Sequence, residues 1–300
     1  MRIGFDYGGT KIAGIALDDD GDVLASGRIP TPRFDYEGGI RAIRDFVARL
    51  EADAGRTADS IGIGVPGSVD RVTGYVTLGN SVWLHGHDLR GDLTEALGKT
   101  VRIGNDANCF ALSEAVDGGG KGADVVFGVI LGTGVGGGIV VHGRPIEGIN
   151  AVAGEWGHMP LPLPKPDEIP GPLCSCGVAG HTESWLSGPN LKADHARSLG
   201  LDIESAPSSS QIAELAEAGD AAALATMERY EDRLGRSLAT IINVLDPDVI
   251  VLGGGVSNIE RLYRTVPEAT RPHVFGDKFN TKIVKNVHGD SSGVRGAAWL

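Results

Sequence analysis

The sequence predicts an α/β protein of two lobes, each of which opens with a glycine-rich β-hairpin. Its 300 residues, 41% hydrophobic and 22% charged, are enough for two lobes of ordinary size. The same plan of strand, glycine turn and strand occurs twice, over residues 1–25 and 125–146. Such an internal repeat indicates a duplicated architecture. We therefore expect two related domains, each containing this hairpin.

The first hairpin is MRIGFDYGGTKIAGIALDDDGDVLA. It contains an apolar strand, a tight turn at Gly8 and Gly9, a second strand, and a further turn at Asp18–Asp22. Thr10 and Lys11 add a hydroxyl donor and a cation next to the first turn. A dinucleotide-binding unit is excluded, because no G-x-G-x-x-G motif opens a helix here.

The second hairpin, VVFGVILGTGVGGGIVVHGRPI, turns at Gly132, Thr133 and Gly134. Glycine has no Cβ, so backbone N–H groups can approach and surround phosphate oxygens. One hairpin of this kind would indicate only a tight turn, but two with matched glycine and threonine favour phosphate binding. Asp6, at the end of the first strand, would face the same place and hold Mg²⁺ through water, since Mg²⁺ prefers few carboxylates and many waters.

Polar residues follow two strands between the hairpins. Gly64–Ser68 ends one apolar strand and would bring backbone near a substrate. VRIGNDANCFALSEA then predicts a strand over Val101–Ile103 and a helix that starts directly after it. Residues at such a junction are often only N-caps. Asn105, Asp106 and Asn108 exceed what one helix start needs, so Asp106 is a candidate to accept the proton of an alcohol that Asn105 orients.

A long amphipathic helix precedes a third glycine cluster. Its apolar residues lie at helical spacing over Leu224–Leu245, and Asp246-Pro247 ends it. VIVL then predicts a buried strand, and Val256–Asn258 could open another helix. A strand that ends in glycines lets a flat adenine lie against the backbone, although alone this feature would be only a loop. The glycines are Gly253, Gly254 and Gly255.

The stretch CSCGVAGH contains two of the only three cysteines in the chain and ends in a histidine. A disulfide is awkward because one serine separates Cys174 from Cys176, and three cysteines cannot form a disulfide framework. From the residues alone, a metal site and a metal-free turn with two free thiols both remain open. The preceding segment, PLPLPKPDEIPGP, cannot be a regular helix and is a lid or, more simply, a stiff spacer. Cys109 is expected in the core.

Charge and hydropathy exclude two classes of partner. The formal net charge is −12 and the pI about 5.1, and affinity for a nucleic-acid backbone comes mostly from Lys and Arg, so no nucleic acid is expected. No apolar run reaches the roughly 18 residues of a membrane span. The first residues lack the layout of a signal peptide. We therefore expect a cytoplasmic protein without a membrane partner.

Taken together, these motifs resemble the ROK family of sugar kinases over almost the whole chain and in the family's order. They are DYGGTK at Asp6–Lys11, GVPG at Gly64–Gly67, NDAN at Asn105–Asn108, LGTGVGGG at Leu131–Gly138, GEWGH at Gly154–His158, CSCGVAGH at Cys174–His181 and DPDVIVLGGG at Asp246–Gly255. The resemblance implies the two-lobed actin-like ATPase (ribonuclease H-like) fold. It also implies transfer of the γ-phosphate of ATP to a sugar hydroxyl.

The resemblance assigns regions and residues to these tasks. Residues 1–118, completed by the last helix at 290–300, would form the N-terminal lobe on the sugar and phosphate side, and 119–289 the C-terminal lobe with ATP and the cysteine loop. Asp106 would be the general base. The sugar would be bound by Gly67, Asn80, Asn105, Asp106, Glu155, His158 and Glu183. ATP and its phosphates, with Mg²⁺, would be bound by Asp6, Gly8, Gly9, Thr10, Lys11, Gly132, Thr133, Gly134, Gly253, Gly254 and Gly255.

The family pattern at the cysteine loop resembles C-x-C-G-x-x-G-C-x-E, whose three cysteines bind zinc together with the histidine of E-x-G-H. His181 stands where the third cysteine belongs. Imidazole is an ordinary zinc ligand, so His158, Cys174, Cys176 and His181 can still form a structural site. The resemblance therefore favours zinc over free thiols. One nitrogen of His158 would bind the metal and the other would meet the sugar.

Two branches of the family resemble this chain in detail. NSVWLHG at Asn80–Gly86 and the final HGDSSGVRGAAWL look closest to bacterial fructokinases, with N-acetylglucosamine kinases next. The leading expectation is therefore fructose 6-phosphate as the product. The alternative of another class is a sugar-sensing regulator without catalysis. Repressor members begin with a helix-turn-helix domain, whereas the first strand here starts at Arg2, which favours the enzyme. The helices are compatible with a homodimer, which the family often forms.

Overall fold

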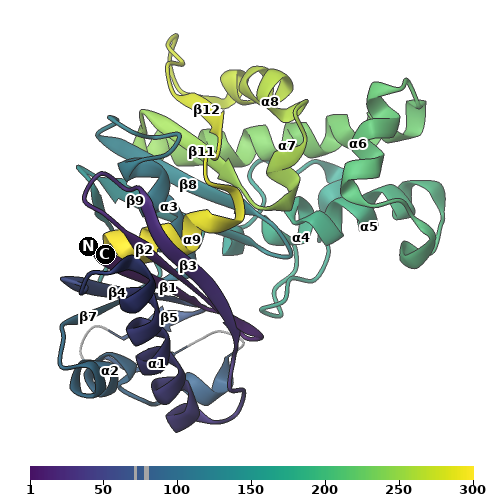
Figure 1. Cartoon of the computed structure of the whole chain (residues 1–300). Coiled ribbons are helices and arrows are strands. Elements are labelled where there is room, and N and C mark those ends of the chain that lie inside the picture. Colours follow the sequence, from purple (N-terminus) through teal and green to yellow (C-terminus); the bar gives the residue numbers. More distant parts are fainter. Residues whose placement is uncertain (71–72, 78–80) are drawn as a thin grey trace. The chain divides into compact units, whose positions relative to one another are not determined.

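The computed structural model describes residues 1–70, 73–77 and 81–300 (Figure 1). Asn80, expected to contact the sugar, lies outside the described residues. The contacts divide the chain into two compact units. The first comprises Met1–Gly122, Gly138–Gly154 and Val287–Leu300, and the second Ala123–Gly137 and Glu155–Asn286.

The first sheet has the strand order β3-β2-β1-β4-β7. Its strands are β1 (Arg2–Tyr7), β2 (Lys11–Leu17), β3 (Val23–Pro30), β4 (Ser60–Val65) and β7 (Val101–Asn105), and β5 (Ser68–Val69) pairs separately with β6 (Val76–Thr77). The first three strands are antiparallel neighbours, whereas β4 runs parallel to β1 and β7 parallel to β4. The expected hairpin at Gly8 and Gly9 is therefore confirmed.

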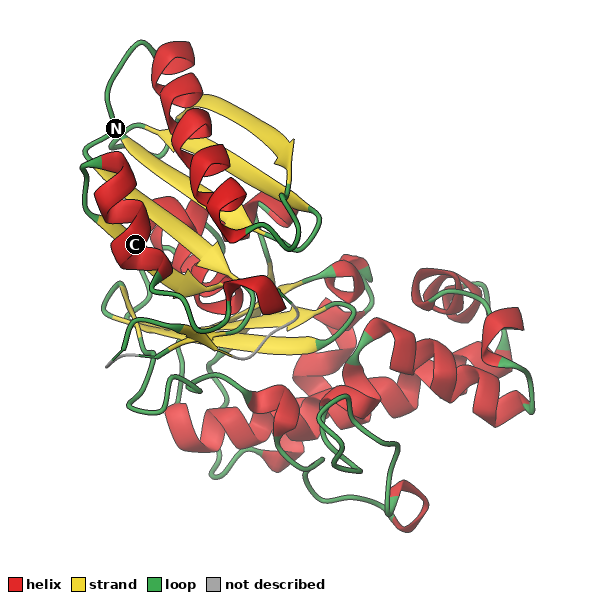
Figure 2. Cartoon of the chain, turned by 90° about the horizontal axis from the view of Figure 1, so that it is seen from below, coloured by secondary structure: helices red, strands yellow, loops and turns green. Residues whose placement is uncertain are grey.

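Helices cover both faces of the first sheet (Figures 1 and 2). Ile3 and Phe5 of β1 point into a core shared with α1 (Tyr36–Ala54). The opposite face meets α9 (Ser292–Trp299), and it can do so closely because β1 has glycine there. A Cβ on Gly4 would lie 2.2 Å from the carbonyl oxygen of Val294. The last helix thus belongs to the first unit, together with α2 (Leu89–Leu97) and α3 (Asp106–Val116).

The second sheet repeats the topology of the first. Its order is β10-β9-β8-β11-β12, so in both sheets the chain supplies its third, second, first, fourth and fifth strands across the sheet. The strands are β8 (Val125–Leu131), β9 (Val135–Val141), β10 (Arg144–Pro145), β11 (Val249–Gly253) and β12 (Lys282–Lys285). β8, β11 and β12 are parallel. This repetition is the expected duplicated α/β architecture.

The helices of the second unit follow the glycine hairpin. They are α4 (Glu183–Leu186), α5 (Gly188–Leu199), α6 (Ser209–Glu217), α7 (Ala221–Leu245) and α8 (Leu262–Thr270). The long amphipathic helix is confirmed as α7, and it ends where Asp246 adopts a left-handed conformation with φ 47°. The helix expected from Val256 is a 3₁₀ turn over Gly255–Asn258, and the α-helix begins only at Leu262.

The compact units differ from the expected lobes at Gly138–Gly154, which the sequence assigned to the C-terminal lobe. These residues belong to the first unit because the end of β9 packs directly on α3. A Cβ on Gly138 would lie 2.7 Å from the carbonyl oxygen of Ala107 and 2.8 Å from the Cβ of Ala111. The boundary near residue 120 is close to the expected one, since the first unit continues to Gly122.

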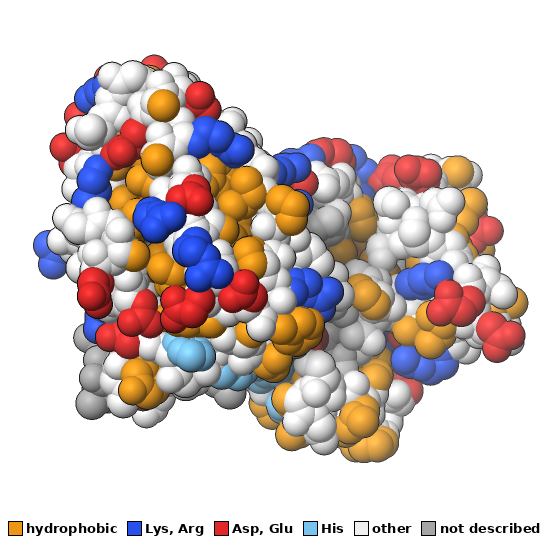
Figure 3. Space-filling view, turned by 60° about the horizontal axis from the view of Figure 1, so that its bottom comes forward, with side chains coloured by type: hydrophobic (Ala, Val, Ile, Leu, Met, Phe, Trp, Pro, Cys, Tyr) orange, Lys and Arg blue, Asp and Glu red, His pale blue; other side chains and the backbone are white. Residues whose placement is uncertain are grey.

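The surface and the helices bear on the expected partners. On the face drawn in Figure 3, acidic and basic side chains lie among one another, without an extended area of Lys and Arg alone. In the part of the chain that the structure describes, none of the helices is long and apolar enough to span a bilayer.

Candidate active site

The carboxyl ends of three parallel strands lie side by side in the first unit. Asp6 of β1 pairs in register with Gly64 of β4, and Val65 of β4 with Asn105 of β7. In open α/β sheets ligands bind at such strand ends. Asp6, Gly67 and Asn105, which the sequence singled out separately, therefore belong to one edge of the sheet.

Asn105 connects the strand end, the helix after it and the GVPG loop. Its Oδ1 accepts hydrogen bonds from the backbone N–H groups of Ala107 (2.8 Å) and Asn108 (3.2 Å), so Asn105 is the N-cap of α3. Its Nδ2 donates to the carbonyl oxygen of Gly67 (2.9 Å). Because Asn105 provides the cap, capping does not account for the carboxylate of Asp106.

Asp106 is the first residue of α3, and it is exposed. Its Oδ1 accepts a hydrogen bond from the backbone N–H of Ala107 (2.9 Å). The first turn of a helix favours negative charge. An exposed carboxylate held at this place can accept the proton of a bound hydroxyl.

The first glycine turn is closed beside the half-buried carboxylate of Asp6. The N–H of Gly8 donates to the carbonyl oxygen of Lys11 (3.1 Å), and Thr31 Oγ1 donates to that of Gly8 (2.7 Å). Burial raises the pKa of Asp6, and the positive charge of Lys11 offsets part of that effect. A cation near a buried carboxylate favours its charged form. Asp6 therefore suits a hydrated Mg²⁺, which needs only one or two protein carboxylates.

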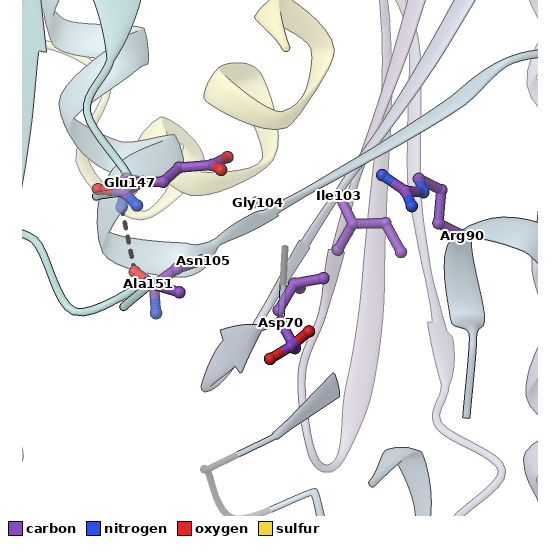
Figure 4. A pocket seen from close by; sticks show the side chains of 9 residues that line it. Asp70, Arg90, Ile103, Gly104, Asn105, Glu147 and Ala151 are labelled. Carbon is purple, nitrogen blue, oxygen red and sulfur yellow. Dashed lines mark hydrogen bonds between the residues drawn. The ribbon is translucent and has the colours of Figure 1, made fainter. Parts of the chain in front are cut away.

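A polar pocket of about 280 Å³ opens beside Asn105 in the first unit (Figure 4). Asn108, only 7% exposed, lines it, and its Oδ1 lacks a hydrogen-bond partner among the described residues. A mixture of charged, amide and apolar groups suits a ligand with both donors and acceptors, such as a sugar. The sequence analysis missed this pocket because its walls come from separate segments. They are Val69, Asp70, Arg90, Ile103, Gly104, Glu147 and Ala151, besides the two asparagines.

In the second unit, the hairpin at Gly132–Gly134 packs against Glu183. Glu183 Oε2 accepts a hydrogen bond from the backbone N–H of Val135 (3.0 Å), and a Cβ on Gly134 would lie 2.7 Å from the same oxygen. Burial raises the pKa of Glu183, but hydrogen bonds from Ser175 and Val135 outweigh it and hold the pKa below its usual value. The carboxylate is thus kept charged at the edge of the glycine turn.

The third glycine cluster lies next to the same hairpin. Gly253 at the end of β11 pairs in register with Ile130 of β8. Gly254 has φ +80°, and a Cβ there would lie 2.5 Å from the carbonyl oxygen of Leu131. Only glycine permits both this conformation and this approach. The second glycine turn and the glycines of Gly253–Gly255 therefore lie at neighbouring strand ends of one sheet.

The four proposed metal ligands meet in the second unit. One ligand atom from each of His158, Cys174, Cys176 and His181 lies within 4.8 Å of the others. Cys174 Sγ is 3.6 Å from His158 Nδ1, and Cys176 Sγ is 3.2 Å from His181 Nδ1. All three cysteines of the chain are free, and Cys109 is buried as expected.

This geometry fits zinc. Zn–S bonds of about 2.3 Å and Zn–N bonds of about 2.0 to 2.1 Å in a tetrahedron separate neighbouring ligand atoms by about 3.3 to 3.8 Å. The two observed sulfur–nitrogen distances lie at or just below that range. His158, Cys174, Cys176 and His181 could therefore hold the ion with small shifts.

His158 has a second nitrogen outside the cluster. Its Nδ1 faces Cys174, whereas its Nε2 lies 3.9 Å from a carboxylate oxygen of Glu155. Glu155 is exposed, and about a third of the His158 side chain is exposed. The expected division of labour between the two nitrogens is therefore geometrically feasible.

Ser175 is a site residue that the sequence analysis missed. Its Oγ donates to Glu183 Oε1 (2.7 Å), and Cys174 Sγ lies 3.4 Å from the same oxygen. The serine between the cysteines thus ties Glu183 to the segment Cys174–His181, which we call the metal loop after its proposed ligands. The signal available in the sequence was the stretch CSCGVAGHTE, because it places the hydroxyl of Ser175 and the carboxylate of Glu183 close together along the chain.

Sequence comparison places the whole chain in one family. The sequence profile of the ROK family matches residues 2–300. The N-acetyl-D-glucosamine kinase of Photobacterium profundum is 40% identical over 304 residues, which cover 100% of this chain and 99% of that protein.

Solved structures agree with this assignment. The ROK hexokinase of Thermus thermophilus superposes with a TM-score of 0.85 at 31% identity, covering 99% of this chain and 96% of that one. A ROK family glucokinase from Streptomyces griseus, in complex with glucose and AMPPNP, superposes with a TM-score of 0.76 at 30% identity, covering 99% and 97%.

Proposed function

Because the chain belongs to the ROK family of sugar kinases, we propose that it transfers the γ-phosphate of ATP to a hydroxyl of N-acetylglucosamine. The observation that carries the phosphotransfer is Asp106, an exposed carboxylate at the start of α3 that capping does not explain. The choice of sugar rests on the relative that is 40% identical over the full chain.

Asp106 acts as the general base. It accepts the proton of the attacking hydroxyl, while Asn105, held by the helix amides and Gly67, orients the sugar. Phosphoryl transfer asks the protein mainly for positioning and for neutralisation of charge. Glu155, His158 and Glu183 bind further hydroxyls, and their carboxylates and imidazole accept or donate hydrogen bonds as a polyol requires.

The glycine turns bind the nucleotide. The turn at Gly8–Lys11 and the turn at Gly132–Gly134 offer backbone N–H groups and threonine hydroxyls to phosphate oxygens. Mg²⁺, when bound through Asp6, neutralises phosphate charge. Gly253–Gly255 provide a flat backbone for the adenine.

The metal loop shapes the sugar side of the site. His158, Cys174, Cys176 and His181 would hold zinc, which supplies a fixed point of attachment and no redox chemistry. His158 then presents Nε2 toward the sugar, and Glu183 is held by Ser175 and Val135. Metal and substrate therefore share one ligand residue.

The expectation of fructose finds no support among these relatives, and N-acetylglucosamine replaces it as the leading acceptor. The test is ADP release by purified protein with Mg²⁺, ATP and a panel of N-acetylglucosamine, fructose, glucose, mannose and N-acetylmannosamine, compared by kcat/KM. A clear preference for N-acetylglucosamine supports the proposal. Preference for fructose restores the earlier expectation, and no release with any sugar favours the sugar-sensing alternative.

A further inference from the structure

Helix α7 presents three arginines on one face. Arg229, Arg233 and Arg236 are spaced i, i+4 and i+7, so they lie along one side of the helix, which we call the arginine face. They meet two carboxylates, Glu168 and Asp194, whose side chains are 3% and 9% exposed. The sequence analysis assigned no role to any of these five residues.

Arg236 uses all of its donors. Its Nε donates to Asp232 (3.1 Å), one terminal nitrogen to the carbonyl oxygens of Pro162 (2.6 Å) and Leu163 (2.7 Å), and the other to both oxygens of Glu168 (2.9 Å each). A guanidinium has five N–H groups, and here each has an acceptor. The side chain is 2% exposed. Arg236 therefore fixes both ends of the loop from Pro162 to Glu168.

Arg233 reaches a second segment. Its Nε donates to Glu168 (2.7 Å), a terminal nitrogen lies 3.1 Å from Asp194, and its guanidinium stacks 4.2 Å from the ring centre of Trp185. Trp185 belongs to α4, which begins at Glu183. The arginine face thus holds the proline-rich segment before the cysteines and the helix after His181.

The two held segments contact each other at the metal loop. The N–H of Leu161 donates to the carbonyl oxygen of Gly180 (2.9 Å), and the N–H of Thr182 donates to that of Met159 (2.8 Å). Gly180 and Thr182 are the residues directly before and after His181, and Met159 directly follows His158. The positions of both histidines are therefore set by backbone that the arginine face anchors.

We propose that Arg236 is a positioning residue for the His158, Cys174, Cys176 and His181 cluster, and through His158 for the sugar. The inference rests on the proposed function for its effect on the sugar. The proline-rich segment is then a spacer held rigidly at a defined place and not a lid. Lysine cannot replace Arg236, because an ammonium has three donors and no planar fork.

The experiment compares zinc affinity of the full-length protein and Arg236→Lys, measured by titration against a chromophoric chelator without substrates. Partners outside the ligand set typically contribute about 10- to 100-fold to metal affinity, and we expect about a tenfold loss. The KM for the sugar should rise several-fold, while the KM for ATP stays unchanged. Wild-type zinc affinity in a folded Arg236→Lys protein would overturn the inference.

Arg261→Lys is the matched control. Arg261 forms a 2.5 Å ion pair with Glu231 of α7, and Glu231 is buried as Glu168 is. The ion pairs of Arg261 are with Glu231 and Glu217, neither of which belongs to the metal loop. Equal loss of zinc affinity in both variants would reduce the effect to general destabilisation and overturn the proposal. If Arg236→Lys does not fold, Glu168→Gln is measured instead. It keeps the size of the side chain, so a smaller loss in the same direction is expected and no loss overturns the inference.

The zinc titration also separates this inference from the proposed function. A wild-type protein that binds zinc but phosphorylates no sugar would remove the proposed function and leave the role of Arg236 to be decided by the titration. A wild-type protein that binds no zinc would overturn the positioning role, whatever its activity.

Discussion

The junction of β7 with α3 and the loop of the Cys and His cluster hold their functional side chains in different ways. Asn105 and Asp106 stand at the end of a strand and the start of a helix, and backbone N–H groups fix them within three residues of the chain. His158 ends the short 3₁₀ turn Trp156–His158, and Cys174 and His181 lie outside the long helices and the named strands. Their positions depend on contacts with residues as distant as Arg236.

The difference indicates two degrees of preorganisation. Regular elements fix the base on their own, so changes elsewhere should leave Asp106 in place. On the two proposals above, the loop needs both a metal and the arginine face, so removal of either should disturb it. Changes at the junction should therefore act mainly on kcat, whereas changes at the loop should act mainly on the KM for the sugar.

The strongest test of the junction is Asp106→Asn. The amide keeps the size of the side chain but cannot accept the proton, so kcat should fall by about 10²- to 10⁴-fold, which is about 3 to 5 kcal/mol of barrier. The sugar Kd, measured by calorimetry, should rise much less than kcat falls, because the amide can still hydrogen-bond the sugar. Asp220→Asn, at the start of α7, is the matched control for a carboxylate at a helix start. Turnover close to wild type in Asp106→Asn would remove the base assignment.

Removal of the metal tests the loop. Dialysis against a chelator should raise the KM for the sugar about tenfold or more, because His158 loses its fixed orientation. The KM for ATP should rise much less, since the hydrogen bonds that close the turn at Gly8–Lys11 do not involve the cluster, and the turn at Gly132–Gly134 meets it only through Glu183. Steady-state kinetics with each substrate varied in turn provide the measurement, and added zinc should restore the value. Equal effects on both KM values would contradict the shared role of His158.

The sequence predicts the regular part of this site and only some of the loop. The strands, the glycine turns and the Asn105 junction follow from local patterns of apolar, glycine and capping residues. The ligands of the cluster were accessible through spacing and family resemblance. The contact of Arg236 with Pro162 joins residues 74 positions apart. No local pattern encodes it, because its partners are backbone carbonyls. The pocket beside Asn105 was missed because its walls come from separate segments of the chain.

A smaller effect is expected at the second glycine turn, where the hairpin of the second unit contacts Glu183. Gly134→Ala places a methyl 2.7 Å from Glu183 Oε2 and should push the carboxylate away from Val135. We expect a several-fold increase in the KM for the sugar. In Gly132→Ala the nearest atom to the new Cβ is 3.9 Å away, so this variant should affect the KM for ATP at most. The same rise in sugar KM for both variants would mean that displacement of the Glu183 carboxylate does not cause the rise.

The smallest effect on activity, and a measurable one on stability, is expected from acid. Burial raises the pKa of Glu168, but the backbone N–H of Lys165 and the guanidinium groups of Arg233 and Arg236 outweigh it, so the pKa lies below its usual value. A carboxylate with a depressed pKa contributes stability above its unfolded pKa of about 4.3 and loses it as the pH falls through the folded pKa. Glu168→Gln should therefore lower the Tm at pH 7, and the difference from wild type should shrink below about pH 4.

Glu51 in the first unit provides the comparison for this titration. Its pKa is also lowered, by Lys99 and the N–H of Ala58 against the effect of burial, but its side chain is 21% exposed, compared with 3% for Glu168. Solvent weakens an ion pair that it reaches, so Glu51→Gln should lower the Tm less at pH 7. Scanning calorimetry between pH 3 and 7 measures both variants. An equal or larger loss for Glu51→Gln would mean that the buried arginine network does not contribute more to stability than the partly exposed pair of Glu51 and Lys99 does.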